Sequence, residues 1–226
     1  MNAEMHRVFA IAWKDVTAER RSKANFNAVA FFAGLMLIMF GMAIGPDNAA
    51  LASVSAGVLW LAILLSGVLS FNRSYEREIE AGALDALLLY PGDRRSIFIG
   101  KFLANLLFVV LVEVIIVPMA AILFKMSIAP IFLPLAGILF LGTVGFVALG
   151  TFYAAMSSRL RAREVLLPLL LFPMLIPLLL ASVRATAALL DPSLAGEAAE
   201  WAKILVIFDV IFLAATFVAF EHVIEG

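Results

Sequence analysis

Long apolar runs separated by short polar stretches dominate this chain. A bilayer hydrocarbon core about 30 Å thick is crossed by roughly 20 mostly apolar residues in an α-helix. Six stretches reach that length, at about 26–45, 49–71, 97–124, 128–156, 164–190 and 201–224. The pattern therefore predicts an all-α integral membrane protein with six transmembrane helices, in which residues 1–226 form a single transmembrane domain.

Prolines and small residues mark expected irregularities within these spans. The fourth span is long enough to tilt, or to break near Pro130 and Pro134. The fifth span contains three prolines, so we expect it to be kinked and packed against protein: Pro168, Pro173 and Pro177. Gly41 and Gly45 form a small-xxx-small pair that indicates close helix packing on the first span. Lys101 lies near the start of the third span, where its ammonium group can reach the interface.

Residues 4–24 precede the first span and are too polar to cross a bilayer. Their apolar residues recur at helical spacing, which predicts an amphipathic helix in the interface with Trp13 at headgroup level. Arg7 and Lys14 lie on the opposite face. Two interpretations stay open, a basic membrane anchor and an elbow helix that moves with a cytosolic partner. The apolar face consists of Met5, Val8, Phe9, Ala12, Trp13 and Val16.

The connection 72–96 mixes charged residues with leucines. Gly82 interrupts the pattern and Pro91-Gly92-Asp93 ends it, which predicts two short helical pieces at about 73–81 and 83–89. Neither piece can span lipid. One interpretation is a solvated loop folded on its own bundle, and the other is a coupling segment presented to a cytosolic ATPase domain. The residues assigned to that coupling segment are Arg73, Glu76, Glu80, Gly82, Leu84, Leu87, Leu88 and Pro91.

Lysine and arginine positions predict the orientation of the chain. Positive residues concentrate in cytoplasmic loops. Thirteen of the sixteen basic residues fall before the first span, at 72–101 from the end of span two to the start of span three, or between spans four and five. The other face has only Lys125, Arg184 and Lys203. We therefore expect both termini in the cytoplasm.

Composition supports the membrane assignment and narrows the function classes. Hydrophobic residues make up 64% of the 226 residues and charged residues only 15%, whereas soluble domains have about a quarter of their residues charged. The net charge of −1 argues against nucleic-acid binding. With no cysteine, thiolate metal sites and cysteine nucleophiles are excluded.

No enzyme motif is present in the sequence. It has no G-x-x-x-x-G-K-[ST] phosphate loop, so ATP would have to bind another chain. It also lacks H-E-x-x-H and G-x-S-x-G, which leaves no basis for a catalytic or metal site. The two histidines, His6 and His222, are expected at the cytoplasmic interface as ordinary polar residues rather than as axial haem ligands.

Two carboxylates fall within predicted spans. Glu113 lies near the middle of the third span and Asp209 in the outer half of the sixth, at depths within about one helical turn of each other. A charge at the bilayer centre costs about 2.5–3.5 kcal/mol on insertion scales, so each should face protein or a cavity. Either they relay protons or line a polar path, or they are protonated and hydrogen-bonded to a neighbouring helix.

Several motifs match one family in order and spacing. They are Ile44-Gly45-Pro46, the run Leu59-Trp60-Leu61-Ala62-Ile63-Leu64-Leu65-Ser66, and Pro173-Met174-Leu175-Ile176-Pro177-Leu178-Leu179-Leu180, with Arg73, Gly82, Leu84, Leu87, Pro91, Lys101 and Ala104 between them. Over about 44–182 the chain resembles the cytochrome c maturation protein B (CcmB) family. The 82–91 portion resembles the coupling segment of ABC-2-type permeases in general.

The resemblance implies a permease subunit in a bacterial inner membrane, without catalytic activity of its own. It implies partners as well: a cytosolic ABC ATPase subunit that binds ATP, other cytochrome c maturation membrane subunits, and a periplasmic haem chaperone. We expect two copies of the permease in the complex, and haem as a handled ligand rather than a resident cofactor. The alternative functions are a proton-coupled secondary transporter that uses Glu113 and Asp209, an ABC-2-type permease for another substrate, and a structural assembly scaffold.

Overall fold

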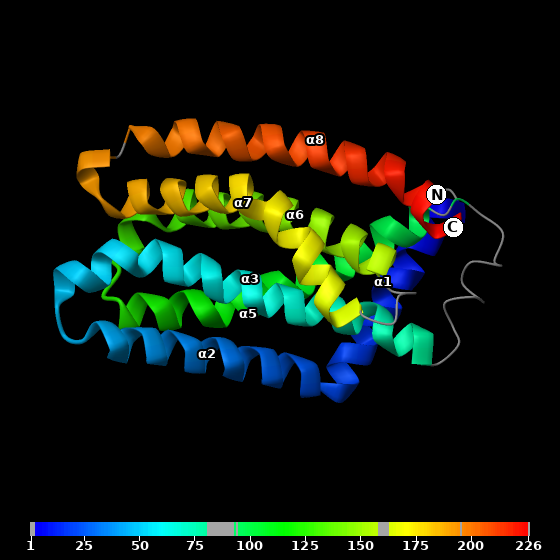
Figure 1. Cartoon of the computed structure of the whole chain (residues 1–226), viewed down its shortest axis with the longest axis horizontal. Coiled ribbons are helices and arrows are strands. Elements are labelled where there is room, and N and C mark those ends of the chain that lie inside the picture. Colours follow the sequence, from blue (N-terminus) through cyan, green and yellow to red (C-terminus); the bar gives the residue numbers. More distant parts are fainter. Residues whose placement is uncertain (1–2, 81–92, 94, 158–162, 195, 226) are drawn as a thin grey trace.

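The computed structural model is a bundle of long helices with one helix lying across its end (Figure 1). It describes residues 3–80, 93, 95–157, 163–194 and 196–225. In that part the helices are α1 (Ala3–Ser22), α2 (Ala24–Ile44), α3 (Asn48–Glu80), α5 (Arg95–Leu123), α6 (Phe132–Ser157), α7 (Arg163–Leu190) and α8 (Glu197–Glu225). Short 3-10 turns, η1 (Ala129–Ile131) and η2 (Pro192–Leu194), precede α6 and follow α7.

The six predicted spans are confirmed. Within the described residues, six helices are long and apolar enough to cross a membrane, at Ala24–Ile44, Asn48–Tyr75, Arg95–Leu123, Ala129–Ser157, Val165–Leu190 and Glu197–Phe220. Large apolar side chains on their outer faces remain exposed, as lipid-facing surfaces require. The fold class is therefore the all-α membrane bundle that the apolar runs predict.

Helix α3 is the centre of the bundle. In its apolar membrane-spanning stretch, 72% of the residues are buried, against 50% or less in the corresponding stretches of the other five spans. It packs against α2, α5, α6 and α7, and its aromatic rings occupy positions opposite glycines of α6. Trp60 lies over Gly142 and donates a hydrogen bond from Nε1 to Thr186 Oγ1 of α7 at 2.9 Å. Phe71 lies over Gly150, so side-chain volume from α3 replaces the missing side chains of α6.

Prolines act as the sequence predicts. The fourth span begins with the 3-10 turn η1, which contains Pro130, and continues unbroken into α6. Pro134 is accommodated in the first turn of α6, where its missing N–H has no helical partner to lose. Helix α7 stays helical through all three of its prolines and bends in its first half (Figure 1). Neighbouring helices α3, α6 and α8 pack against it along the way.

One packing prediction is wrong, and one predicted helical piece belongs to a longer helix. A Cβ atom at Gly41 or Gly45 would meet nothing within 4 Å, so the pair makes no close contact with another helix of the described chain. Gly45 instead ends α2 with φ 82°. The stretch 73–80 is no separate helical piece, because α3 continues through it to Glu80. The second expected piece, 83–89, lies outside the described residues.

Candidate functional site: the end of the bundle beneath α1

Helix α1 lies across the end of the bundle that also holds both chain termini (Figure 1). It packs along α5, where Gly100 permits the close approach. A Cβ atom at Gly100 would lie 2.8 Å from the Ile11 Cβ and 3.1 Å from the Val8 carbonyl oxygen. Only a glycine lets the two helix backbones come this close, so α1 has a fixed seat on α5.

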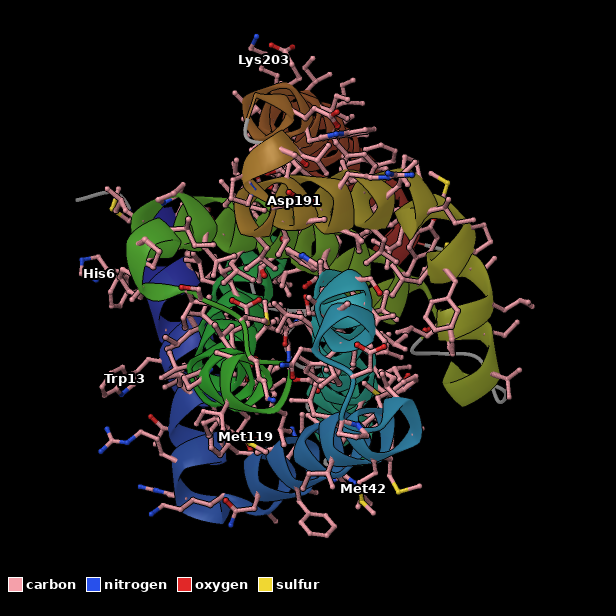
Figure 2. All side chains as sticks on the ribbon, turned by 90° about the vertical axis from the view of Figure 1, so that its left-hand side faces the viewer. His6, Trp13, Met42, Met119, Asp191 and Lys203 are labelled. Atoms are coloured by element: carbon pink, nitrogen blue, oxygen red, sulfur yellow. The ribbon has the colours of Figure 1, made fainter. Side chains whose placement is uncertain are left out.

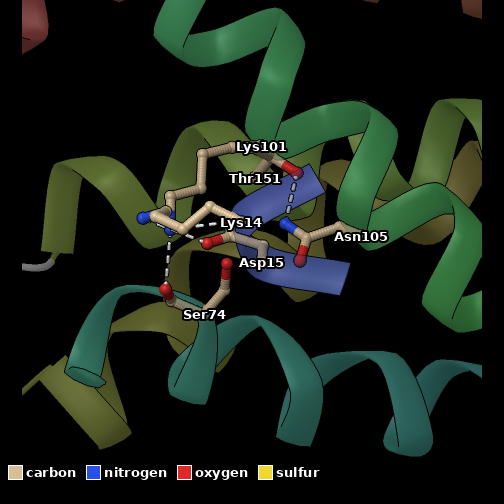
Figure 3. A network of polar contacts seen from close by, with 6 residues as sticks. All are labelled: Lys14, Asp15, Ser74, Lys101, Asn105 and Thr151. Carbon is tan, nitrogen blue, oxygen red and sulfur yellow. Dashed lines mark hydrogen bonds and ion pairs between the residues drawn. The ribbon is translucent and has the colours of Figure 1, made fainter. Parts of the chain in front are cut away.

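A buried lysine joins α1, α3 and α5 beneath that seat (Figure 3). The Lys101 side chain is 0% exposed, and its Nζ lies 3.0 Å from Asp15 Oδ2 of α1. The same Nζ donates a hydrogen bond to the Ser74 carbonyl oxygen of α3 at 2.9 Å and lies 4.9 Å from the centre of the Tyr75 ring. Lys14 Nζ adds a contact to Asp15 Oδ1 at 3.1 Å.

This arrangement corrects the sequence-based expectation for Lys101. The ammonium group does not extend to the interface, because Asp15, Ser74 and Tyr75 surround it inside the protein. A buried charge needs a partner of opposite charge and hydrogen bonds to be tolerated. One layer deeper, Asn105 Nδ2 donates to Thr151 Oγ1 of α6 at 3.0 Å, which extends the polar contacts to a fourth helix (Figure 3).

Helix α1 also contacts the far end of the connection between α3 and α5. Arg7 Nη1 donates to the Asp93 carbonyl oxygen at 3.3 Å, and Glu4 Oε1 accepts a hydrogen bond from the Asp93 backbone N–H at 3.2 Å. Because the Lys101 contacts involve Ser74 near the start of the connection, α1 is linked to the chain on both sides of residues 81–92.

The predicted coupling residues fall only partly within the described chain. Arg73 is exposed near the end of α3. Glu76 and Glu80 belong to the last two turns of α3. The remaining five predicted residues lie outside the described residues, so their grouping stays a prediction: Gly82, Leu84, Leu87, Leu88 and Pro91.

Part of the apolar face of α1 packs against the bundle, and the rest is exposed. Phe9 and Trp13 are 70% and 61% exposed, and Trp13 points away from the bundle together with the nearby His6 (Figure 2). Val8 and Ala12 are half-buried, and Ile11 is buried although it lies beside the predicted face. This division fits a helix packed on protein along one edge and placed in the membrane interface along the other.

A pocket of about 580 Å³ opens where α1 meets α2, and we refer to it as the elbow pocket. Its walls come from α1, α2, α3 and α5. The chain turns here at Lys23, which has a left-handed backbone conformation with φ 50°. Glu19 Oε1 accepts a hydrogen bond from the Phe26 backbone N–H at 2.9 Å, so a side chain of α1 caps the start of α2.

The two predicted intramembrane carboxylates meet α6 from different sides. Glu113 of α5 is buried and accepts a hydrogen bond from the Thr143 hydroxyl. Asp209 of α8 is buried against Gly145, and neither of its oxygens has a hydrogen-bond partner among the described residues. Residues 143 and 145 differ by about 200° around a helix, so α6 stands between the carboxylates although their depths agree within about 3 Å.

The surroundings of Glu113 are tightly packed. A gap between α3 and α5 that borders Glu113, Ser66 and Gly67 has no room for a water molecule. No group of three or more histidine, cysteine, aspartate or glutamate residues that could hold a metal ion occurs in the described chain. The geometry around Glu113 therefore suits a helix-to-helix hydrogen bond.

Sequence reasoning missed the residues that fix α1. Asp15 and Gly100 were not singled out, and Lys101 was assigned to the interface. The sequence does mark both charged residues as unusual, since Asp15 borders the apolar face of the amphipathic helix and Lys101 interrupts an apolar run. Their pairing across 86 residues could not be inferred from either helix alone.

Comparison with known proteins agrees with this architecture. The sequence model of the CcmB protein family matches residues 6–225. The chain is 38% identical over 184 residues to heme exporter protein B of Escherichia coli K12, covering 81% of this chain and 80% of that protein. It is 32% identical over 173 residues to heme exporter protein B of Rhodobacter capsulatus, covering 76% and 78%. The chain belongs to the CcmB family.

Proposed function

We propose that this chain is the permease subunit of an ABC transporter complex of cytochrome c maturation. In this proposal a separate cytosolic subunit hydrolyses ATP, and the permease couples that reaction to haem export or to release of a haem-loaded periplasmic chaperone. Family membership and the name of the relatives, heme exporter protein B, support haem as the class of cargo. Haem is a handled ligand here, and the chain itself supplies no catalytic group.

The observation that carries the coupling role is the double attachment of α1. It contacts Asp93 on one side of residues 81–92 and, through Lys101, Ser74 on the other. A push on the α3–α5 connection by an ATPase subunit would therefore move α1, α3 and α5 together. This makes the end of the bundle beneath α1 the place where a nucleotide-driven motion enters the membrane domain.

The proposed orientation places this end in the cytoplasm of a bacterium, with the chain in the inner membrane. Both termini lie at the same end of the bundle, as an even number of spans requires (Figure 1). The basic residues before α2, around the α3–α5 connection and between α6 and α7 favour the cytoplasmic side for this end. Two permease copies in the complex would present two such ends to a pair of ATPase domains.

Co-purification with the ATPase subunit tests the proposal. We expect Leu84→Asp or Leu87→Asp to abolish recovery of the ATPase with the tagged chain from native membranes, because a buried carboxylate opposes an apolar contact. Leu194→Asp makes the same chemical change at the opposite end of the bundle and should leave recovery intact. Undiminished ATPase recovery with both coupling-segment variants would contradict the docking assignment.

A second test separates ATP coupling from proton coupling through the intramembrane carboxylates. The amide of a Glu113→Gln variant can still accept the Thr143 hydrogen bond, so we expect cytochrome c maturation to persist. We expect maturation to persist in Asp209→Asn as well, because neither Asp209 oxygen accepts a hydrogen bond from the described residues. Loss of maturation in a variant that inserts normally and retains the ATPase would instead favour a proton-coupled transporter.

A further inference from the structure

The lining of the elbow pocket combines exposed cations with apolar side chains. Arg20, Lys23 and Arg73 line it and are exposed. Phe26 of α2 and Leu107 and Leu111 of α5 supply apolar walls. Its volume of about 580 Å³ falls in the range of about 300–1,000 Å³ typical of ligand pockets. The shape suits a molecule with an anionic end and an apolar end.

The acidic residues in the lining are already engaged. Asp15 pairs with the buried Lys101, and Glu19 caps the start of α2. By contrast, Arg20, Lys23 and Arg73 form no ion pair with any residue in the described ranges. The lining of the pocket therefore holds positive charge that the described protein does not neutralise, and three cations in one lining favour an anion.

A buried amide inside the pocket also lacks a partner. Asn25 lines the pocket and is only 3% exposed, yet its Oδ1 accepts no hydrogen bond from the described chain. A buried acceptor without a donor loses its hydrogen bonds to water without replacement, so native proteins rarely leave one unpaired. A ligand that carries a hydroxyl group next to its anionic group would supply the missing donor.

The apolar walls continue onto the outside of the bundle. Leu107 and Leu111 are 43% and 48% exposed, on a helix that spans the membrane. A lipid could therefore slide its acyl chains along α5 into the pocket without leaving the bilayer. Among the described lining residues there is no histidine, methionine, cysteine or tyrosine to ligate a haem iron, which argues against the proposed cargo as the occupant.

We propose that the elbow pocket binds one anionic phospholipid with a hydroxyl-bearing headgroup, taken from the leaflet on the side of the chain termini. Its phosphate lies among Arg20, Lys23 and Arg73, its headgroup hydroxyl donates to Asn25, and its acyl chains lie along Phe26, Leu107 and Leu111. Phosphatidylglycerol has this chemistry. The bound lipid would fill the angle between α1 and α2 and hold the two helices at their observed separation.

Lipid retention on the full-length protein tests the assignment. The chain is purified into mixed micelles of phosphatidylcholine and phosphatidylglycerol, and retained lipid is counted by native mass spectrometry. We expect one phosphatidylglycerol per chain and no comparable retention of phosphatidylcholine. The triple variant Arg20→Gln, Lys23→Gln, Arg73→Gln should weaken retention about a hundredfold, since each basic residue near an anionic lipid contributes roughly fivefold.

A matched variant controls for loss of positive charge. Lys125→Gln, Arg184→Gln, Lys203→Gln removes three cations from the opposite face and should retain phosphatidylglycerol like the parent protein. Asn25→Ala should weaken retention about two- to tenfold, as expected for one hydrogen bond. Unchanged elution on size exclusion chromatography shows that the variants remain folded.

Competition distinguishes a lipid site from a site for soluble anions. Glycerophosphoglycerol, the same headgroup without acyl chains, and inorganic phosphate should each displace the lipid only weakly. Strong displacement by either one would overturn the proposal in favour of a soluble anion, and displacement by haem would assign the pocket to the cargo. Equal retention of both phospholipids, or equal losses in the two triple variants, would also overturn it.

Discussion

The two ends of the bundle are built in different ways. At the end opposite the termini, most polar contacts join residues two or three positions apart. Asp47 accepts a hydrogen bond from the Ala49 N–H, and Asp191 accepts one from the Ser193 N–H. Lys203 forms an ion pair with Glu200. Beneath α1 the polar contacts join residues far apart in sequence, with Asp15 bonded to Lys101 and Arg7 to Asp93. One end closes turns, and the other holds separate segments together.

The difference shows where each end can transmit force. A turn that satisfies its own hydrogen bonds can change its conformation without moving a neighbouring helix. The opposite end has one longer-range contact, from Lys125 Nζ to Asn48 Oδ1 at 2.6 Å. Beneath α1, by contrast, one buried ammonium group contacts α1, α3 and α5, so a shift of any one of these helices affects the other two. We therefore expect equal chemical changes at the two ends to have unequal effects.

Removing the counterion of Lys101 should have the largest effect. Asp15→Ala leaves a buried ammonium group without its carboxylate, which costs about 3–5 kcal/mol for a buried pair, and we expect about 3 because Asp15 is 20% exposed. Thermal unfolding in detergent and protease cleavage of α1 measure this loss.

Two controls sharpen that prediction. Lys14→Ala removes a more exposed partner of Asp15 and should cost less than about 1 kcal/mol. The double variant Asp15→Leu, Lys101→Met replaces the ion pair with apolar groups and should recover most of the stability. Equal destabilisation by Lys14→Ala and Asp15→Ala would show that the buried pair does not fix α1.

Filling the seat of α1 should have the next largest effect. A side chain in Gly100→Leu collides with Ile11 and the Val8 carbonyl group, so α1 must shift, at about 1–3 kcal/mol. Protease sensitivity of α1 should rise with it. Gly137→Leu is the matched control, because a Cβ atom there meets nothing within 4 Å. If α1 stays resistant to protease in Gly100→Leu, the close contact with Gly100 does not fix the position of α1.

A turn at the opposite end should respond less strongly. Asp47 Oδ1 accepts from the Ala49 N–H at 2.9 Å at the start of α3, so Asp47→Ala should cost about 1 kcal/mol, typical of a lost N-cap. Asp47→Asn keeps the acceptor and should be close to neutral. ATPase recovery should be unchanged in both, and its loss in Asp47→Ala would break the comparison between the ends.

The smallest effect concerns the turn after α7. Hydrogen bonds from the Ser193 hydroxyl and from its backbone N–H hold the pKa of Asp191 below its usual value. A lowered pKa means that this contribution to stability is complete above the usual aspartate pKa near 4 and is lost as pH falls through the folded value. Carboxyl NMR titration should show the pKa rising in Ser193→Ala. No rise would contradict the assigned cause.

The sequence predicted elements well and long-range pairs poorly. Six spans follow from apolar length alone, and the 3-10 turn at Pro130 and the bend of α7 follow from proline geometry. The glycine pattern misled, because Gly41 and Gly45 have the small-residue spacing whereas Gly100 and Gly142 make the contacts. Spacing within one helix does not tell which glycine faces a partner, since that depends on how the helices are rotated.

The same limit applies to the candidate site. The equal depth of Glu113 and Asp209 was predictable from residue counting, but their placement against different faces of α6 was not. The division of the α1 apolar face also required the structure, because Ile11 faces α5 while Trp13 faces outward. The coupling-segment residues beyond Glu80 stay a prediction.

The contact between Asp15 and Lys101 has a consequence for synthesis. Helix α1 leaves the ribosome 86 residues before the lysine it will bind, so at about 5–20 residues per second it waits roughly 4–17 s without its partner. During that interval the exposed Phe9 and Trp13 side chains can hold it at the membrane surface, because large apolar residues favour the interface. The exposed Phe9 and Trp13 would then keep α1 at the membrane during synthesis, before Asp15 binds Lys101 in the finished bundle.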